Sequence, residues 1–121
     1  ADKDGKAAAG FGTNGYVRLS LGMNAEITKL TMQGSKILAL GWAAKSATDA
    51  TKEMLLVRFN SDGSVDTTFG TSGIIRFANP GGFTGDTRGT AALWDGSSLF
   101  VAGPAYRGAT SLNDMMIWRL N

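Results

Sequence analysis

Residues 69–73 read Phe-Gly-Thr-Ser-Gly, and residues 11–15 read Phe-Gly-Thr-Asn-Gly, 58 positions earlier in a chain of 121 residues. The turn dipeptide Asp4-Gly5 returns at the same spacing as Asp62-Gly63. A spacing shared by separate motifs is the signature of a repeat architecture. The chain therefore contains at least one internal duplication.

The repetition continues beyond these motifs with a slightly longer spacing. Residues 33–41 (QGSKILALG) align with residues 95–103 (DGSSLFVAG), 62 positions apart, and residues 56–60 (LVRFN) align with 117–121 (IWRLN), 61 apart. The extra residues lie in the Gly- and Pro-containing stretch 79–87. We therefore expect a single domain over residues 1–121, made of two copies over about 2–60 and 61–121.

The sequence of each copy predicts four short strands and no helix. Apolar residues tend to alternate with polar ones in several of these segments, and Gly-containing turns separate the segments. No segment long enough to form a helix shows a 3.6-residue period of apolar residues. The dipeptides Asp62-Gly63 and Asp95-Gly96 are strong turn signals, because Gly accepts a positive φ. A tight turn is also expected at Gln33-Gly34. The predicted strands are Tyr16–Leu21, Glu26–Met32, Lys36–Ala43, Glu53–Phe59, Ile74–Ala78, Arg88–Trp94, Ser98–Ala105 and Asp114–Leu120.

The later strands of each copy carry apolar residues on both faces. Residues 54–57 (MLLV) and 115–118 (MMIW) are unbroken apolar runs, which predicts strands that are covered on both sides. Two stacked four-stranded sheets leave their outer faces exposed, so we expect further copies to cover them. The predicted fold class is all-β, with two four-stranded antiparallel blades per chain in a β-propeller-like arrangement. Three chains would give six blades, within the usual four to eight.

The two ends of the sequence also fit a ring of identical chains. Asn121 is the counterpart of Asn60, after which the first copy continues into an Asp-Gly turn. Residues 2–5 supply such a turn at the other end of the chain. The expected partner is therefore the chain itself, as a homotrimer, although a fragment trimmed from a tandem array would have the same ends.

Composition narrows the chemistry. The chain has no Cys and no His, which excludes disulfides, thiolate nucleophiles, imidazole ligands and Ser–His catalysis. A net charge of only +2 disfavours nucleic-acid binding. No apolar run approaches the roughly 20 residues needed to cross a bilayer, so membrane insertion is not expected, and residues 1–4 do not resemble a signal peptide.

Residues 57–73 (VRFNSDGSVDTTFGTSG) resemble the signature of the delta-60 repeat, and residues 34–41 (GSKILALG) resemble the inner hairpin of that family. The resemblance covers nearly the whole chain. It departs from the family at residues 6–10 (KAAAG), which replace the Ser-Val-Asp-Thr-Thr segment, and in having two copies where the family commonly has many. The resemblance implies a propeller-like repeat in a bacterial exported or surface protein, and it implies no catalytic residues.

Two repeated features invite a functional interpretation, but a structural one is preferred. Residues 2–5 and 60–66 look like calcium loops, yet neither supplies the full ligand set of an EF-hand, so we expect turns and no metal site. The paired arginines recur in both copies, which favours structural pairing with a turn carboxylate such as Asp62 or Asp66, or with carbonyls at strand ends. These arginines are Arg18 with Arg76 and Arg58 with Arg119.

Residues that differ between the copies are better ligand-binding candidates, because the architecture does not require them. Aromatic and charged side chains on loops can hold a sugar by stacking and hydrogen bonds. Strand residue Trp42, like Trp94 and Trp118, can also be explained by packing. The candidate residues are Trp42, Phe83, Asp86, Arg88, Tyr106 and Arg107.

Two further patterns are weak. The Gly-x-Gly-x-x-Gly string at residues 10–15 has no following helix, so it predicts a turn and no dinucleotide site. Glu26 and Glu53, with eight Asp residues, could supply a carboxylate pair for glycoside cleavage, but their spacing selects no pair.

The resemblance, together with the absence of Cys and His, implies a non-enzymatic adhesion module at the cell surface or outside the cell, for example at a fibre tip, with the periplasm as the alternative location. It would bind a glycan or another cell-surface ligand through its loops and need no cofactor. A purely structural oligomerisation or capping domain and a carbohydrate-active enzyme are the alternatives. The structural alternative predicts no pocket with converging polar groups. The enzyme predicts two carboxylates about 5 to 9.5 Å apart in a cleft.

Overall fold

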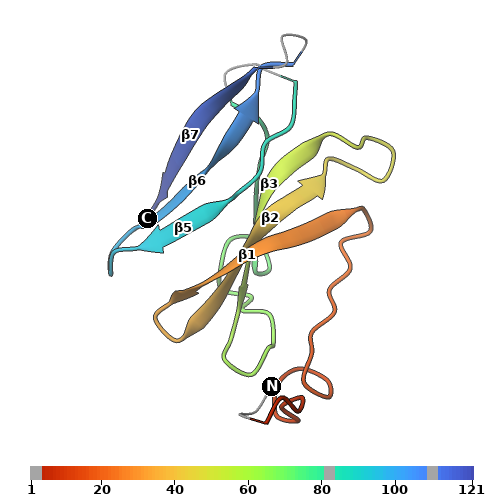
Figure 1. The fold of residues 1–121 in the computed structure, drawn as a ribbon, viewed down its shortest axis with the longest axis vertical. Helices are drawn as coiled ribbons and strands as arrows, with labels where there is room; N and C mark the ends of the chain where they lie inside the picture. The colour runs from red at the N-terminus through yellow and green to blue at the C-terminus, as the bar shows by residue number, and fades with distance from the viewer. Residues whose placement is uncertain (1–3, 81–83, 109–111) are drawn as a thin grey trace.

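The computed structural model describes residues 4–80, 84–108 and 112–121 (Figure 1). The described residues form seven β-strands and no helix, so they include no helix that could span a membrane. The all-β prediction is confirmed. The strands are β1 (Ala25–Gln33), β2 (Lys36–Ala44), β3 (Lys52–Phe59), β4 (Ile74–Phe77), β5 (Ala91–Trp94), β6 (Leu99–Tyr106) and β7 (Asn113–Leu120).

The strands form two antiparallel sheets. Sheet 1 has four strands in the order β1-β2-β3-β4, and sheet 2 has three strands in the order β5-β6-β7 (Figure 1). Strand β4 belongs to the second sequence copy but pairs with β3 of the first, through Val57 opposite Ile74 and Met54 opposite Phe77. Sheet 1 is therefore completed by a strand from the next copy.

The prediction of two four-stranded sheets is wrong for the second sheet. The described residues of the segment Tyr16–Leu21, predicted to be a strand, form only an isolated bridge between Thr13 and Tyr16. Strand β5 is also shorter than the predicted Arg88–Trp94, because the chain at Thr87 and Gly89 bonds to sheet 1 instead. A strand needs a neighbouring strand for its backbone groups, and residues 16–21 have none here.

The predicted tight turns occur where the dipeptides place them. Gly34 (φ 60°) joins β1 to β2, and Gly96 (φ 95°) lies between β5 and β6. The carboxylate of Asp95 accepts hydrogen bonds from the backbone N–H groups of Ser97 (2.8 Å) and Ser98 (2.7 Å). Each turn therefore rests on local chemistry that the sequence displays.

The principal core lies between the two sheets. Sheet 1 contributes Leu38, Leu40, Met54 and Leu56, all fully buried, and sheet 2 contributes Leu99 and Val101. Ile75, Phe77, Trp94, Trp118 and Leu120 pack around this cluster. The rings of Phe77 and Trp118 stack with centroids 6.2 Å apart. The expected packing of Trp94 and Trp118 is thus confirmed.

Hydrogen bonds also join the two sheets at one end. The backbone N–H of Thr87 donates to the carbonyl of Lys52 (2.9 Å), and that of Gly89 donates to the carbonyl of Gly41 (3.0 Å). The buried Thr87 hydroxyl donates to the carbonyl of Pro104 (3.0 Å). The segment that leads into sheet 2 is thereby attached to both sheets.

A polar cluster fixes the loop between β3 and β4. Asp66, only 4% exposed, forms an ion pair with Arg58 (2.9 Å) and accepts a hydrogen bond from the Thr68 hydroxyl (2.6 Å). The Thr68 hydroxyl bond is the main cause that lowers the pKa of Asp66 to about 2, and the charges of Arg58 and Lys36 add to it against the opposing effect of burial. The expected structural pairing of Arg58 is confirmed.

Candidate functional site

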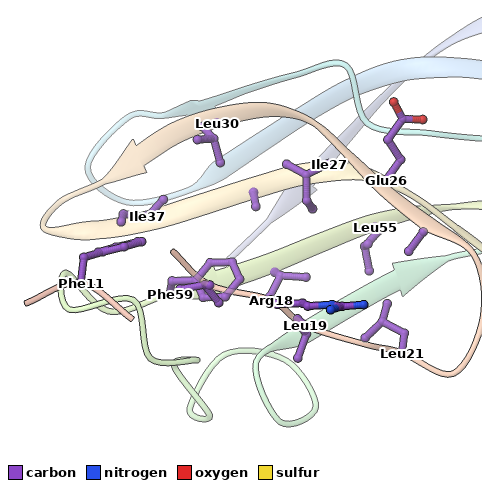
Figure 2. Close-up of a pocket in the computed structure, with 14 residues that line it drawn as sticks. Phe11, Arg18, Leu19, Leu21, Glu26, Ile27, Leu30, Ile37, Leu55 and Phe59 are labelled. Atoms are coloured by element: carbon purple, nitrogen blue, oxygen red, sulfur yellow. The ribbon is translucent and has the colours of Figure 1, made fainter. Parts of the chain in front are cut away.

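A hollow with a mostly apolar lining lies between the N-terminal segment and one face of sheet 1. Its cavity volume is about 440 Å³. Figure 2 shows Phe11 and Phe59 toward one end of this groove and Leu21 and Leu55 toward the other. We call it the N-terminal groove, and it is lined by Phe11, Val17, Arg18, Leu19, Leu21, Ala25, Glu26, Ile27, Leu30, Ile37, Ala39, Leu55, Val57 and Phe59.

The N-terminal segment is held at this groove by its turn. Gly12, Asn14 and Gly15 have positive φ angles of 54°, 53° and 90°, nearly those of their counterparts 70, 72 and 73. The backbone N–H of Gly12 donates to the carbonyl of Asp62 (2.7 Å), which ties the turn to the β3–β4 loop. The string at residues 10–15 is thus a turn, as predicted.

The groove wall on sheet 1 is part of one face of the sheet. Cross-strand pairs place Met32 beside Ile37, Leu30 beside Ala39, and Ala39 beside Val57. Leu30 and Met32 remain 63% and 55% exposed even though they lie on this face. An apolar face with this exposure is suited to contact with another apolar protein surface.

The outer face of sheet 2 is a second exposed apolar surface. Met115 is 97% exposed, Ile117 73% and Leu93 65%. The register places Pro104 beside Met115 and Ala102 beside Ile117 on this face. The outward face of sheet 2 thus lacks cover, as the sequence predicts. The outward face of sheet 1 is only partly open, because Leu55 and Val57 are buried with Leu21 packed against them.

The ligand-binding candidates predicted from the sequence, which lie on β2 and on loops, are mostly engaged in structural contacts. Trp42 Nε1 donates to the Glu26 carboxylate (3.1 Å), and the Lys52 ammonium lies 4.4 Å from the centre of the Trp42 ring. The Asp86 carboxylate accepts a hydrogen bond from the backbone N–H of Lys52 (2.8 Å). These two candidates therefore meet through Lys52.

The other predicted ligand-binding residues differ in their surroundings. Tyr106 donates its backbone N–H to the carbonyl of Asp86 (2.9 Å), so the structure brings these two together. Arg107 forms an ion pair with Asp114 (2.8 Å), and Arg88 is exposed. Phe83 lies outside the described residues. A cavity of about 290 Å³ is lined by Lys45, Asp49, Thr51, Lys52, Glu53, Ala78, Asn79, Thr84 and Gly85.

The residues of the weaker sequence patterns make structural contacts in the part of the chain that the structure describes, residues 4–80, 84–108 and 112–121. Asp62 accepts hydrogen bonds from the backbone N–H (2.9 Å) and hydroxyl (2.6 Å) of Ser64, which lower its pKa, as expected of a turn. Within these ranges no three His, Cys, Asp or Glu side chains gather as a metal site. Glu26 and Glu53 bind different partners, Trp42 and Arg76 (2.7 Å).

The groove was not among the sites predicted from the sequence. Its signal was present, because residues 36–43 carry apolar side chains on both faces. Which of the two faces the sheet–sheet core would cover was not readable from that pattern. Comparisons with protein-family models, with curated proteins and with solved structures found no match for this chain.

Proposed function

We propose that this chain is a non-enzymatic assembly unit, which joins further copies of itself into a closed, propeller-like ring. The observation that carries the proposal is that each face in the intersheet core has a repeat-equivalent face outside that core. The equivalent face on sheet 2 is exposed, and the equivalent face on sheet 1 lines the N-terminal groove. The core face of sheet 1 corresponds by sequence to the outer face of sheet 2. The core face of sheet 2 corresponds to the groove face of sheet 1.

The correspondence follows the repeat spacing of 61 to 62 residues. Leu56, buried in the core, corresponds to Ile117, which is 73% exposed. Val101, buried in the core, corresponds to Ala39 of the groove wall. The other pairs are Leu38 with Phe100, Leu40 with Ala102, Met54 with Met115, Ile37 with Leu99, Val57 with Trp118 and Phe59 with Leu120.

Such a pair of complementary but different faces gives a head-to-tail contact, which closes into a ring when the rotation permits. The contact inside one chain is then repeated between chains. We propose three chains and six sheets, in line with the resemblance to delta-60 repeats and with the usual blade number. The partner is the same chain, and the proposal needs neither a cofactor nor a catalytic residue.

Light scattering coupled to size-exclusion chromatography tests this function. We expect a mass about three times that of one 12.6 kDa chain, and Ile117→Lys should reduce it to one chain, because a charge on the outer face of sheet 2 cannot be buried unpaired. Leu112→Lys is the matched control, since Leu112 is 58% exposed but lies just before β7, outside the two faces. A monomeric parent chain at high concentration would contradict the proposal.

A second candidate function is recognition of a polar ligand, such as a cell-surface glycan, through the loops. The observation that favours it is the cavity lined by polar residues that include Lys52. Lys52 contacts Trp42 and Asp86, and the backbone of Asp86 contacts that of Tyr106, so these three residues lie close to the cavity without lining it. A glycan array tests it. Binding that is lost in Trp42→Ala or Tyr106→Ala, and kept in Leu112→Ala, would support the role. No binding to any presented sugar would contradict it.

A further inference from the structure

Sheet 2 has a free edge at β7, to which a strand from another copy could pair. Among the described residues, β7 pairs with β6 on one side and with no strand on the other. Its counterpart β3 has both sides occupied, by β2 and by β4. An unpaired strand edge presents a row of backbone donors and acceptors to any strand that can reach it.

The N-terminal segment is the repeat-equivalent of the strand that fills this position in sheet 1. Residues 16–19 (Tyr-Val-Arg-Leu) correspond to residues 74–77 (Ile-Ile-Arg-Phe), which form β4. Both follow the same turn, with matching φ angles and matching bridges, Thr13 to Tyr16 and Thr71 to Ile74. The segment is therefore preformed up to the residue at which β4 begins.

The position of the segment against sheet 1 also matches that of β4. Ile75 and Phe77 of β4 pack against the core face of sheet 2. Their equivalents Val17 and Leu19 line the groove against the equivalent face of sheet 1. Residues 16–19 thus lie against sheet 1 as β4 lies against sheet 2. Unlike β4, they have no strand beside them to pair with among the described residues.

We infer that residues 16–19 of one copy pair with β7 of a second copy, so that each chain completes the second sheet of its neighbour. This inference rests on the proposed assembly function and names its contact. The β3–β4 register transfers directly. It places Leu19 opposite Met115, Arg18 opposite Met116, Val17 opposite Ile117 and Tyr16 opposite Trp118.

Charge complementarity supports the same register. Arg76 of β4 binds the Glu53 carboxylate at 2.7 Å. The equivalents of these two residues are Arg18 and Asp114. In the proposed pairing, Arg18 of one copy would reach Asp114 of the next, whose present partner Arg107 is exposed.

Disulfide trapping tests the register, and the chain suits it because it has no Cys. The Arg58 N–H donates to the Gly73 carbonyl (3.1 Å), so the pair equivalent to Leu55 and Arg76 lies at a closely spaced, non-hydrogen-bonded site. An Arg18→Cys chain is mixed with a Met116→Cys chain and oxidised. Only a contact between two chains can then join residue 18 to residue 116.

Met115→Cys is the matched control, because residue 115 is also Met but faces the opposite side of β7. We expect the disulfide yield with Met116→Cys to exceed that with Met115→Cys by about tenfold, since only the former pair has bonding geometry. Equal yields, or no disulfide, in a mixture that light scattering shows to be oligomeric would overturn the strand pairing and leave the assembly function standing. A monomeric mixture would overturn both.

Hydrogen exchange of the unsubstituted chain gives an independent readout. Amides two residues apart along a strand point to the same side, so those of Met115, Ile117 and Arg119 face the free edge of β7. We expect these three to exchange at least about tenfold more slowly in the oligomer than at monomeric dilution. Met116 and Trp118, which face β6, should exchange slowly in both, and unchanged rates at the first three would overturn the pairing.

Discussion

At the residue scale, close backbone approach explains two of the repeated glycines. A Cβ on Gly41 would collide with the carbonyl of Glu26, and a Cβ on Gly103 would collide with the carbonyl of Arg88. Each carbonyl belongs to the strand or lead-in segment that passes beside the glycine. The absence of a side chain at these two positions lets the neighbouring backbone lie in contact with β2 and β6.

Gly41→Ala and Gly103→Ala should therefore lower the free energy of unfolding by about 1–3 kcal/mol each, the usual cost of overpacking. Gly10→Ala is the control, since a Cβ there meets nothing within 4 Å and its φ is not positive. Urea denaturation monitored by tryptophan fluorescence measures all three. A Gly41→Ala chain as stable as the Gly10→Ala chain would contradict this account.

Asp66 should make stability dependent on acid pH. Its pKa in the folded chain, about 2, lies below the ordinary 3.8, so the ionised carboxylate stabilises the fold. This contribution is complete above the ordinary value and is lost as the pH falls through about 2. The difference in melting temperature between the parent chain and Asp66→Asn should be constant from pH 7 to about 5 and shrink toward pH 2. A difference that did not change with pH would contradict the assignment.

At the element scale, a partner decides whether a segment becomes a strand. Residues 16–19 and 74–77 share their turn and much of their pattern, but only the latter lie beside a strand edge in this chain. The loops that precede them differ at residues 6–10 and 64–68, and one of these differences removes a carboxylate. Asp66 pairs with Arg58, whereas its equivalent, Ala8, offers no carboxylate to Arg119, the equivalent of Arg58.

Ala8→Asp should strengthen the proposed contact between copies. The Cβ of Gly15 would meet Ala7 and Ala8 as that of Gly73 meets Val65 and Asp66, so the loops are equivalent in space. A carboxylate at residue 8 would face Arg119 of the neighbouring copy, and we expect the dissociation constant to fall about threefold to tenfold. Sedimentation equilibrium measures it, with Ala9→Asp as the control. An unchanged or weaker association in Ala8→Asp alone would contradict the pairing.

At the scale of the whole molecule, equivalent residues of the two copies have different roles. Leu56 is fully buried between the sheets, and Ile117, its counterpart, is mostly exposed. Equivalent residues of the two copies cannot have the same environment in one isolated chain, because a stack of two sheets has one interior contact and two outer faces. A ring of copies would make the environments of the two residues alike again.

Leu56→Ala should lower the free energy of unfolding by about 2–5 kcal/mol at every protein concentration, because it opens a cavity in the core. Ile117→Ala should change the unfolding of dilute, monomeric protein by about 0.5 kcal/mol or less, and should instead raise the concentration at which chains associate. Urea titrations at two protein concentrations, combined with light scattering, separate these effects. Equal destabilisation of dilute protein by both changes would contradict the difference in burial.

The loop candidates show why a binding site was harder to predict than the fold. The comparison of the two copies assigned no structural role to Trp42, Asp86 and Arg107. In the folded chain each of them has a partner: Glu26 for Trp42, the Lys52 backbone for Asp86, and Asp114 for Arg107. Those partners lie on other strands or loops. A residue type and its spacing do not tell which neighbour will satisfy it.

The sequence by itself determined the duplication, the all-β class, the turns at Gly34 and Gly96, and the presence of more apolar strand surface than two sheets can cover. These features depend on residue types and short spacings, which act locally along the chain. Only the tertiary structure decided that β4 completes sheet 1, that residues 16–21 stay unpaired, and which faces form the core. Those outcomes depend on which segments meet in space. Because the two copies have similar sequences, the apolar pattern of a segment fits more than one strand edge or sheet face.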